Sequence, residues 1–181
     1  DFASYRMTPL AIAEGRTNPE GSFTLAEVDW PRAAAPWQYS VIIAYKPGLA
    51  LGWRRVEQPG LPLEIRLQQP QPIGGTIQNL EGKGIAGAHV GLMQAALVKE
   101  TTSGRDEGEW FMAPPDLLPS LVATTDADGA FSFDLLPPNV ELGVEITAPG
   151  YGTVIATVSE KSPGVIKLGQ AAALKIGRAH V

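Results

Sequence analysis

The chain has 181 residues, of which 44% are hydrophobic, and its formal net charge is −5. This length allows one large domain or two small ones with packed cores, and the acidic balance argues against a nucleic-acid partner. The absence of cysteine excludes disulfides and thiolate chemistry. No apolar run reaches the roughly 18 residues of a membrane span, so no membrane insertion is expected in this segment.

The first part of the chain, residues 1–69, is predicted to contain short strands joined by turns. Apolar and polar residues alternate over several short stretches, and frequent Gly and Pro separate them. The predicted strands lie near 11–17, 22–28, 38–45, 50–57 and 63–68. The run QQPQP at 68–72 is predicted to be a short, stiff linker, because proline restricts its own φ and the residue before it.

The second part, residues 70–174, shows the same alternation and turn punctuation over a longer stretch. Seven strands are predicted near 73–78, 88–94, 121–125, 130–135, 140–147, 152–159 and 165–168. Residues 95–120 are predicted to form a long loop between the second and third of these strands. A loop of that length commonly has a function or is disordered.

The two parts repeat one another in sequence. RTNPEGSFTL (16–25) matches TTDADGAFSF (124–133), and SVIIAYKPGLA (40–50) matches LGVEITAPGYG (142–152). LEIRL (63–67) matches GVIKL (164–168) in the same order. Three ordered matches predict a partial first copy (1–69), which lacks its opening strands, and a complete second copy (70–174). The alternative is that any two hairpins look alike.

Residues 175–181 are expected to be either the start of a third copy or an artefact. IGRAHV (176–181) is also what the translation of a widely used sequencing adapter would give.

Asp126 and Asp128, followed by Gly129, allow two interpretations. A calcium loop begins with such spacing, but it also needs further oxygen ligands and a terminal bidentate acid. The residues after Gly129 alternate like a strand, so we expect a tight hairpin turn with Gly129 at positive φ. The matching turn of the first copy keeps its glycine, Gly21, and loses one aspartate. The two aspartates are therefore the only metal candidates, and the turn is the preferred interpretation.

The order of three motifs resembles a known family. GGTIQNLEGKGIAGAHVGL (74–92), TTDADGAFSF and VEITAPGYGTV (144–154) are similar to the carboxypeptidase regulatory-like domain, also described as transthyretin-like or prealbumin-like, with collagen-adhesin B-type repeats as relatives. The resemblance covers residues 72–168 well and 11–69 in part; Gly84-Ile85 departs from the usual Gly-Pro or Lys-Pro. It implies an all-β, seven-stranded Greek-key sandwich, here preceded by a partial copy of the same sandwich.

The resemblance also bears on the late turn and on covalent chemistry. Pro149, Gly150 and Tyr151 match the turn that follows a late strand of the family. In adhesin repeats a glutamate placed like Glu145 promotes a Lys–Asn isopeptide bond. Such a bond requires a buried lysine on the first strand and an asparagine or aspartate on the last. The predicted first strand contains no lysine, and the predicted last strand contains neither asparagine nor aspartate. We therefore expect no crosslink.

No catalytic or cofactor site is predicted. His89 has no second ligand at metal spacing and is expected to be a half-exposed strand residue. The serines have no evident His/Asp partners, and the chain has neither a P-loop nor a G-x-G-x-x-G motif.

The 99–113 loop and the tryptophans are the candidate interaction surfaces. The loop carries Arg105, Glu109, Trp110, Phe111 and Met112, a combination that favours either a docking surface or a cap over one end of the sandwich. Three tryptophans of the first copy could either form the interface between the copies or stack on sugars. They are Trp30, Trp37 and Trp53.

The expected function is non-catalytic: a spacer or interaction module within a larger multidomain protein, with neighbouring domains of the same chain as partners. The first alternative is a carbohydrate- or protein-binding module that uses the 99–113 loop and exposed tryptophans. The second is an accessory domain of an attached peptidase. An extracytoplasmic location is implied by the resemblance alone.

Overall fold

The computed structural model describes residues 13–25, 40–58, 60–101, 104–113, 121–161 and 164–171, and for 99–101 and 104–107 it describes only the backbone. These residues form strands and no helix, which confirms the all-β prediction. The strands are β1 (Ser40–Ala44), β2 (Gly52–Val56), β3 (Ile73–Asn79), β4 (His89–Thr101), β5 (Gly104–Met112), β6 (Val122–Thr124), β7 (Ala130–Phe133), β8 (Val140–Thr147), β9 (Val154–Ser159) and β10 (Val165–Leu168). The described part of the chain contains no helix that could cross a membrane.

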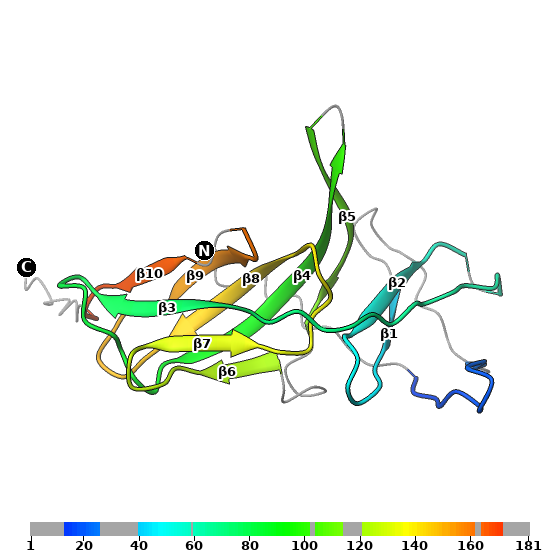
Figure 1. The fold of residues 1–181 in the computed structure, drawn as a ribbon, viewed down its shortest axis with the longest axis horizontal. Helices are drawn as coiled ribbons and strands as arrows, with labels where there is room; N and C mark the ends of the chain where they lie inside the picture. Colours follow the sequence, from blue (N-terminus) through cyan, green and yellow to red (C-terminus); the bar gives the residue numbers. More distant parts are fainter. Residues whose placement is uncertain are drawn as a thin grey trace, which may run out of the picture.

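Two sheets of the second copy lie face to face (Figure 1). In one, β3 lies between β10, which is parallel to it, and β7, which is antiparallel. In the other, the order is β5-β4-β8-β9, and β6 also pairs with β4. Residues 89–91 of β4 pair with β6 and residues 94–101 pair with β5, so β5 and β6 share one edge of β4.

The hydrophobic core fills the space between these sheets. β8 shows the required alternation, since Val140, Leu142, Val144 and Ile146 are all buried while the residues between them are half-buried. Inward-facing residues of the opposite sheet complete the core; they include Ile73, Ile77, Phe131, Phe133 and Leu168. Burying a large apolar side chain contributes about 1.5–3 kcal/mol, so this period-two pattern is the main reason the second copy is sandwich-like.

Thr125 is the buried polar residue of the core, and its hydroxyl is fully used. Oγ1 donates to the carbonyl of Ile85 at 2.6 Å and accepts from the amide of Ala88 at 2.8 Å. Both bonds span the connection between β3 and β4. Because unpaired buried polar groups are costly, this threonine fixes where that connection passes.

The prediction of a long loop at 95–120 is wrong for its described part. β4 continues to Thr101 and β5 returns from Gly104, so the two strands form a long antiparallel ribbon that extends beyond the rest of the sheet (Figure 1). Residues of opposite charge occupy paired positions in it, with Lys99 opposite Asp106 and Glu100 opposite Arg105. Opposite charges at paired positions favour strand pairing, whereas the loop was predicted from the length of the segment between two predicted strands.

The hairpin expected from 121–125 and 130–135 is also wrong in its pairing. β6 pairs with β4, whereas β7 pairs with β3 in the opposite sheet. The turn at Gly129 therefore carries the chain from one sheet to the other. The physical reason is burial, because pairing with β3 places Phe131 and Phe133 of β7 in the core between the two sheets.

Fewer strands form in the first copy than predicted. β1 and β2 make a two-stranded sheet, but residues 63–68 and the described parts of 11–17 and 22–28 form no strand. In the second copy the matching strands, β10 and β7, both bond to β3. The described residues of the first copy include no equivalent of β3, so these segments have no partner.

The β1–β2 register repeats that of β8 and β9 residue by residue. Ser40 pairs with Val56, and their equivalents Leu142 and Val158 pair with each other. The same holds for every pair along the two strands. The sequence match at 40–50 thus corresponds to a match in backbone geometry.

The two glycine turns repeat as well. In the first copy the Asn18 amide donates to the Ser22 carbonyl at 2.9 Å and Ser22 N donates to Asn18 Oδ1 at 2.8 Å. In the second copy Asp126 and Ala130 make the same two bonds, at 2.9 and 2.8 Å. The turn chemistry is therefore local, because it forms with or without the strands that flank it.

Candidate functional site: the junction between the two copies

A buried aromatic pair joins the first copy to the second. Trp53 of β2 and Phe111 of β5 have ring centroids 4.8 Å apart at an interplanar angle of 57°. Their exposed fractions are only 3% and 1%. The indole Nε1 donates to the carbonyl of Glu109 at 3.0 Å, so the polar group of the tryptophan is also satisfied. The pair belongs to a buried cluster that also includes Leu51, and Val41 and Ile43 of β1 pack against this cluster.

The carboxylate of Glu109 holds the same hairpin at a second place. Oε1 accepts from Arg54 Nη1 at 3.0 Å, and Oε2 accepts from the Arg55 amide at 3.2 Å. Side-chain exposure is 47% for Arg54 and 32% for Glu109, and a pair this open to solvent is worth at most about 1 kcal/mol. Its role is therefore to orient β2 along β5 more than to stabilise it.

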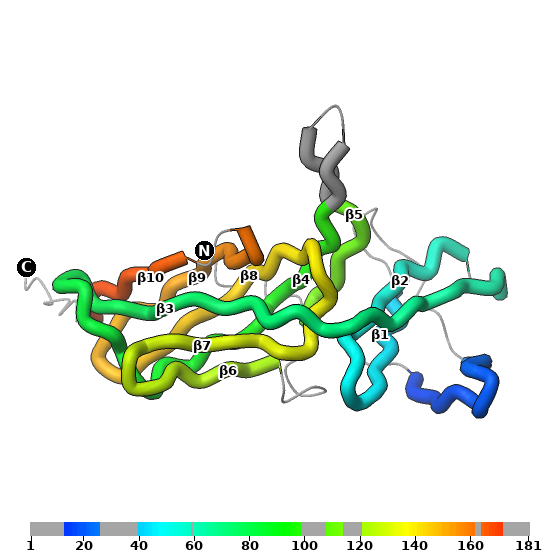
Figure 2. Tube along the Cα trace, in the orientation of Figure 1, coloured from blue at the N-terminus to red at the C-terminus, as the bar shows by residue number. Residues whose placement is uncertain are grey.

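Residues 63–68 cover the other face of the hairpin, as the returning tube in Figure 2 shows. Gly52 permits this close approach, since a Cβ there would lie 2.6 Å from Ile65 and 2.8 Å from Leu67. The Ala50 amide donates to the Gln68 carbonyl at 2.9 Å. The β1–β2 hairpin is thus held between this segment and the sandwich.

Backbone bonds fix the chain on both sides of the junction. Leu51 N donates to the Leu135 carbonyl at 2.8 Å, and Gln71 N donates to the Leu136 carbonyl at 2.9 Å. Residues before and after 57–68 are therefore anchored to the same short stretch between β7 and β8. This double attachment limits how far the first copy can pivot.

The predicted interaction loop is distributed over β5. Phe111 points into the core, while Glu109, Trp110 and Met112 are half-buried. The side chain of Arg105 lies outside the described residues. Trp53 is buried at the junction, and Trp30 and Trp37 lie outside the described residues. Two of the aromatic side chains that ligand stacking would use, Trp53 and Phe111, are thus already covered.

The aspartate turn uses its carboxylate internally. Asp126 Oδ1 accepts from the amides of Asp128 and Ala130 at 2.9 and 2.8 Å, while both aspartate side chains are exposed. Gly129 adopts a φ of 80°, and its carbonyl accepts from Ile77 N at 2.8 Å. Among the described residues no group of three or more potential ligand side chains is placed to hold a metal ion.

Two of the other predicted turn residues are also glycines at positive φ. Gly21 and Gly150 have φ values of 84° and 83°. Pro149 is exposed beside Gly150, and Tyr151 is half-buried and forms a bridge with Gln170. His89 is exposed on β4, and Glu145 is half-buried on β8.

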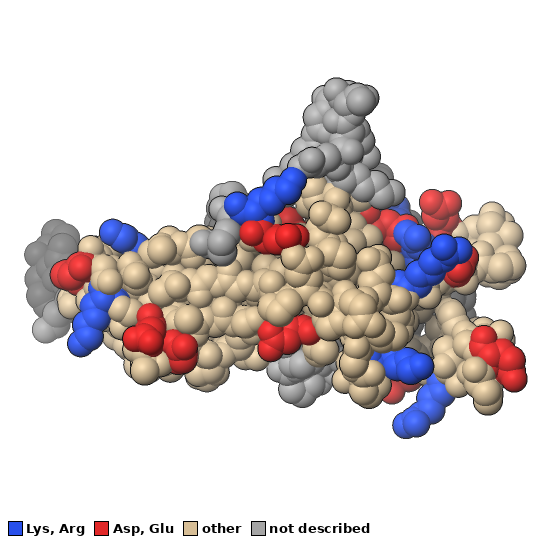
Figure 3. All heavy atoms as spheres, viewed as in Figure 1, with Lys and Arg blue, Asp and Glu red and all other residues tan. Residues whose placement is uncertain are grey.

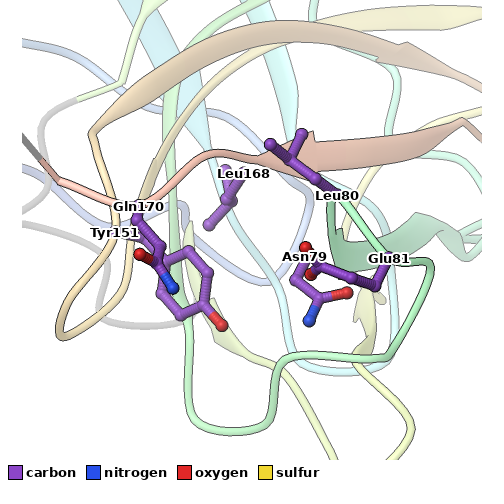
Figure 4. A pocket seen from close by; sticks show the side chains of 6 residues that line it. All are labelled: Asn79, Leu80, Glu81, Tyr151, Leu168 and Gln170. Carbon is purple, nitrogen blue, oxygen red and sulfur yellow. The ribbon is translucent and has the colours of Figure 1, made fainter.

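A shallow hollow of about 260 Å³ lies at the end of the sandwich away from the first copy. Tyr151 and Gln170 line one side and Asn79 and Glu81 the other, with Leu168 between them (Figure 4). Asn79 Oδ1 already accepts from the Lys83 amide at 2.8 Å. No buried side-chain polar atom of the described residues lacks a partner, so the hollow does not present a group that requires a ligand.

Charged side chains of both signs are interspersed over the described face in Figure 3. The Arg54–Glu109 ion pair lies between the two copies. This pair could not be found in the sequence, because its two residues are separated by 55 positions and neither lies in a motif. Trp53 was the available signal, since a large aromatic beside a glycine in a short strand indicates a packed contact.

Comparison with protein-family models, with curated proteins and with solved structures found no match to this chain.

Proposed function

We propose that this chain is a non-catalytic structural module of a larger extracytoplasmic multidomain protein. In this proposal it contains tandem carboxypeptidase regulatory-like sandwiches, the second a complete seven-stranded Greek key and the first partial, which space and stiffen the parts of the protein on either side. The motifs in residues 74–154 support the family, and the repeated β-register and turn bonds support the tandem arrangement.

The observation that carries the proposal is the junction at Trp53. The first copy docks on β5 through a buried aromatic pair, an indole hydrogen bond and the carboxylate of Glu109. A flexible linker would leave the outer face of β2 in solvent. The fixed contact instead aligns the two copies end to end along the long axis of the molecule (Figure 1), which is the geometry that a spacer requires.

The burial of Trp53 and Phe111 also favours a structural role over ligand stacking. A carbohydrate-binding site usually presents aromatic faces to solvent, and these two rings are almost fully covered. The binding alternative then depends on Trp110, whose side chain is half-buried.

A distance measurement between spin labels tests the spacer role. Because the chain has no cysteine, the variants Tyr45→Cys and Glu81→Cys would carry the only thiols. Tyr45 is 51% exposed in the first copy, and Glu81 is exposed at the far end of the second. A spacer predicts one narrow distance distribution, as narrow as that of a control pair within the second copy, Glu81→Cys with Asp134→Cys.

The same labelled chain carrying Trp53→Ala provides the contrast. Loss of the aromatic contact is expected to broaden the distribution between the copies and leave the control pair unchanged. A broad distribution in the unmodified chain would refute the spacer role. A glycan or peptide screen that found specific binding abolished by substitution of Trp110 would favour the alternative.

A further inference from the structure

Among the described residues, one edge of the first copy has no neighbouring strand where its equivalent in the second copy has one. Within the described residues β1 pairs with β2 alone, whereas β8 lies between β4 and β9. β1 and β2 repeat the register of β8 and β9 at every paired position. The edge of β1 that faces away from β2 therefore corresponds to the edge of β8 that β4 occupies.

The second copy shows what such a neighbour looks like. Val144 and Ile146 of β8 pair with Leu92 and Val90 of β4, in antiparallel orientation. All of these residues are buried. A strand beside β1 would place equivalent side chains next to Ile42, which occupies the position of Val144.

Burial of β1 indicates the same missing neighbour. All five of its residues are half-buried, whereas β8 alternates between buried and half-buried positions along most of its length. Ile42 of β1 and Val144 of β8 show the contrast, because Val144 is fully buried whereas Ile42 is half-buried. A further strand would place side chains beside those of β1 and shield their flanks, as Leu92 of β4 lies beside Val144.

The β1 edge also lacks the devices that discourage strand addition. Natural edge strands use charged side chains, proline or bulges to prevent pairing with another chain. The sequence of β1, SVIIA, contains no charge and no proline, and its register with β2 has no bulge. β2, on the opposite side, carries Arg54 and Arg55.

We propose that the outer edge of β1 accepts an additional antiparallel strand from an extended peptide segment with small or apolar residues at alternate positions. Backbone hydrogen bonds would provide affinity and the alternating side chains would provide register. The occupant resembles Ala88–Leu92 in pattern, because Val90 and Leu92 are buried residues of β4 and Ala88, just before the strand, is buried in the same alternation. This inference rests on the structural repeat and not on the spacer role.

Hydrogen exchange of the full chain with an added peptide tests the proposal. The probe is a synthetic peptide with the sequence of residues 86–97, AGAHVGLMQAAL. At about ten times its dissociation constant, those amides of Ser40–Ala44 that point away from β2 are expected to exchange about tenfold more slowly, while the amides of β10 remain unchanged. The matched control is the same peptide with alternate amides N-methylated, which keeps the side chains but removes the backbone donors.

A crosslink then tests the register. In the second copy Leu142 pairs with Ala95, so Ser40→Cys is expected to form a disulfide with a peptide that carries cysteine at the position of Ala95. Tyr45→Cys, just beyond the strand, is the control. It should form the disulfide with the cysteine peptide no faster than it does with a peptide of scrambled sequence. Failure of both the protection and the crosslink overturns the proposal. The proposal is also overturned if the N-methylated peptide protects β1 equally well. It is likewise overturned if raising the protein concentration without peptide protects β1, because the occupant is then a second copy of the chain. The peptide experiments and the spin-label experiment are independent, so failure of the strand-addition proposal would leave the distance distribution expected of a spacer unchanged.

Discussion

Replacing Trp53 with alanine should release the first copy while the second stays folded. A buried Trp→Ala change costs about 3–5 kcal/mol. The lost bond to the Glu109 carbonyl accounts for about 1 kcal/mol of this, and the lost ring contact with Phe111 for about 0.5–1.5 kcal/mol. A lone two-stranded hairpin is only marginally stable in water, so a loss of this size should exceed what keeps β1–β2 docked.

Native-state hydrogen exchange distinguishes local release from global unfolding. Amides of Ser40–Ala44 and Gly52–Val56 should lose protection in Trp53→Ala, while those of β4 and β8 keep it. Trp53→Phe keeps an aromatic ring at the site and loses the indole bond, so its cost should be smaller, about 1–2 kcal/mol.

The equivalent position of the second copy provides the matched control. Ile155 occupies the same register position as Trp53 but is 66% exposed. Ile155→Ala should change stability by less than about 0.5 kcal/mol. The reasoning is refuted if Trp53→Ala leaves protection of β1 and β2 intact, or if both alanine variants cost the same.

Four other substitutions test the turns, the buried hydroxyl and a surface ion pair. Gly129→Ala should cost more than the roughly 1–2 kcal/mol of positive-φ strain, because the added Cβ would lie 2.3 Å from a backbone oxygen. In Gly21→Ala the added Cβ would contact no atom within 4 Å, so this variant should lose less stability. Equal melting temperatures for the two variants would contradict this reasoning. Thr125→Val should cost about 2–4 kcal/mol in urea unfolding by leaving two buried backbone groups unpaired, and a cost under about 1 kcal/mol would show that water replaces the hydroxyl. The hydrogen bond and charge of Arg66 lower the pKa of Glu64, so the pair stabilises the fold above the ordinary glutamate pKa, and this stabilisation is lost as pH falls through the lowered value. In Arg66→Gln, an NMR titration should show that the pKa of Glu64 has risen toward the ordinary value. An unchanged pKa would rule out Arg66 as the cause.

Local chemistry made much of the fold predictable from the sequence. Period-two alternation located most strands of the second copy, because each strand buries one face against a single core. The turn with Gly129 and its copy with Gly21 were found because a glycine after Asp or Asn closes a turn through bonds within five residues. Such features depend on neighbours in the chain, so they are visible in one dimension.

Pairing was the part that local patterns could not decide. The sequence analysis joined 121–125 to 130–135 because they are adjacent, but the structure places them in opposite sheets. Segment 63–68 has a strand-like pattern and is not a strand, because the strand that would bond to it is absent from the described part of the first copy. A strand is completed by its partner, and the partner's identity depends on the whole fold.

The sequence by itself determined the all-β class, the repeated turns and the apolar faces of the strands, since these follow from side-chain spacing and the backbone freedom of glycine. The tertiary structure alone decided that Trp53 meets Phe111, that Glu109 binds two consecutive residues of β2, and that the β1 edge has no second neighbour among the described residues. The physical reason is distance along the chain. Contacts between residues more than fifty positions apart form only when the sheets that carry them have assembled.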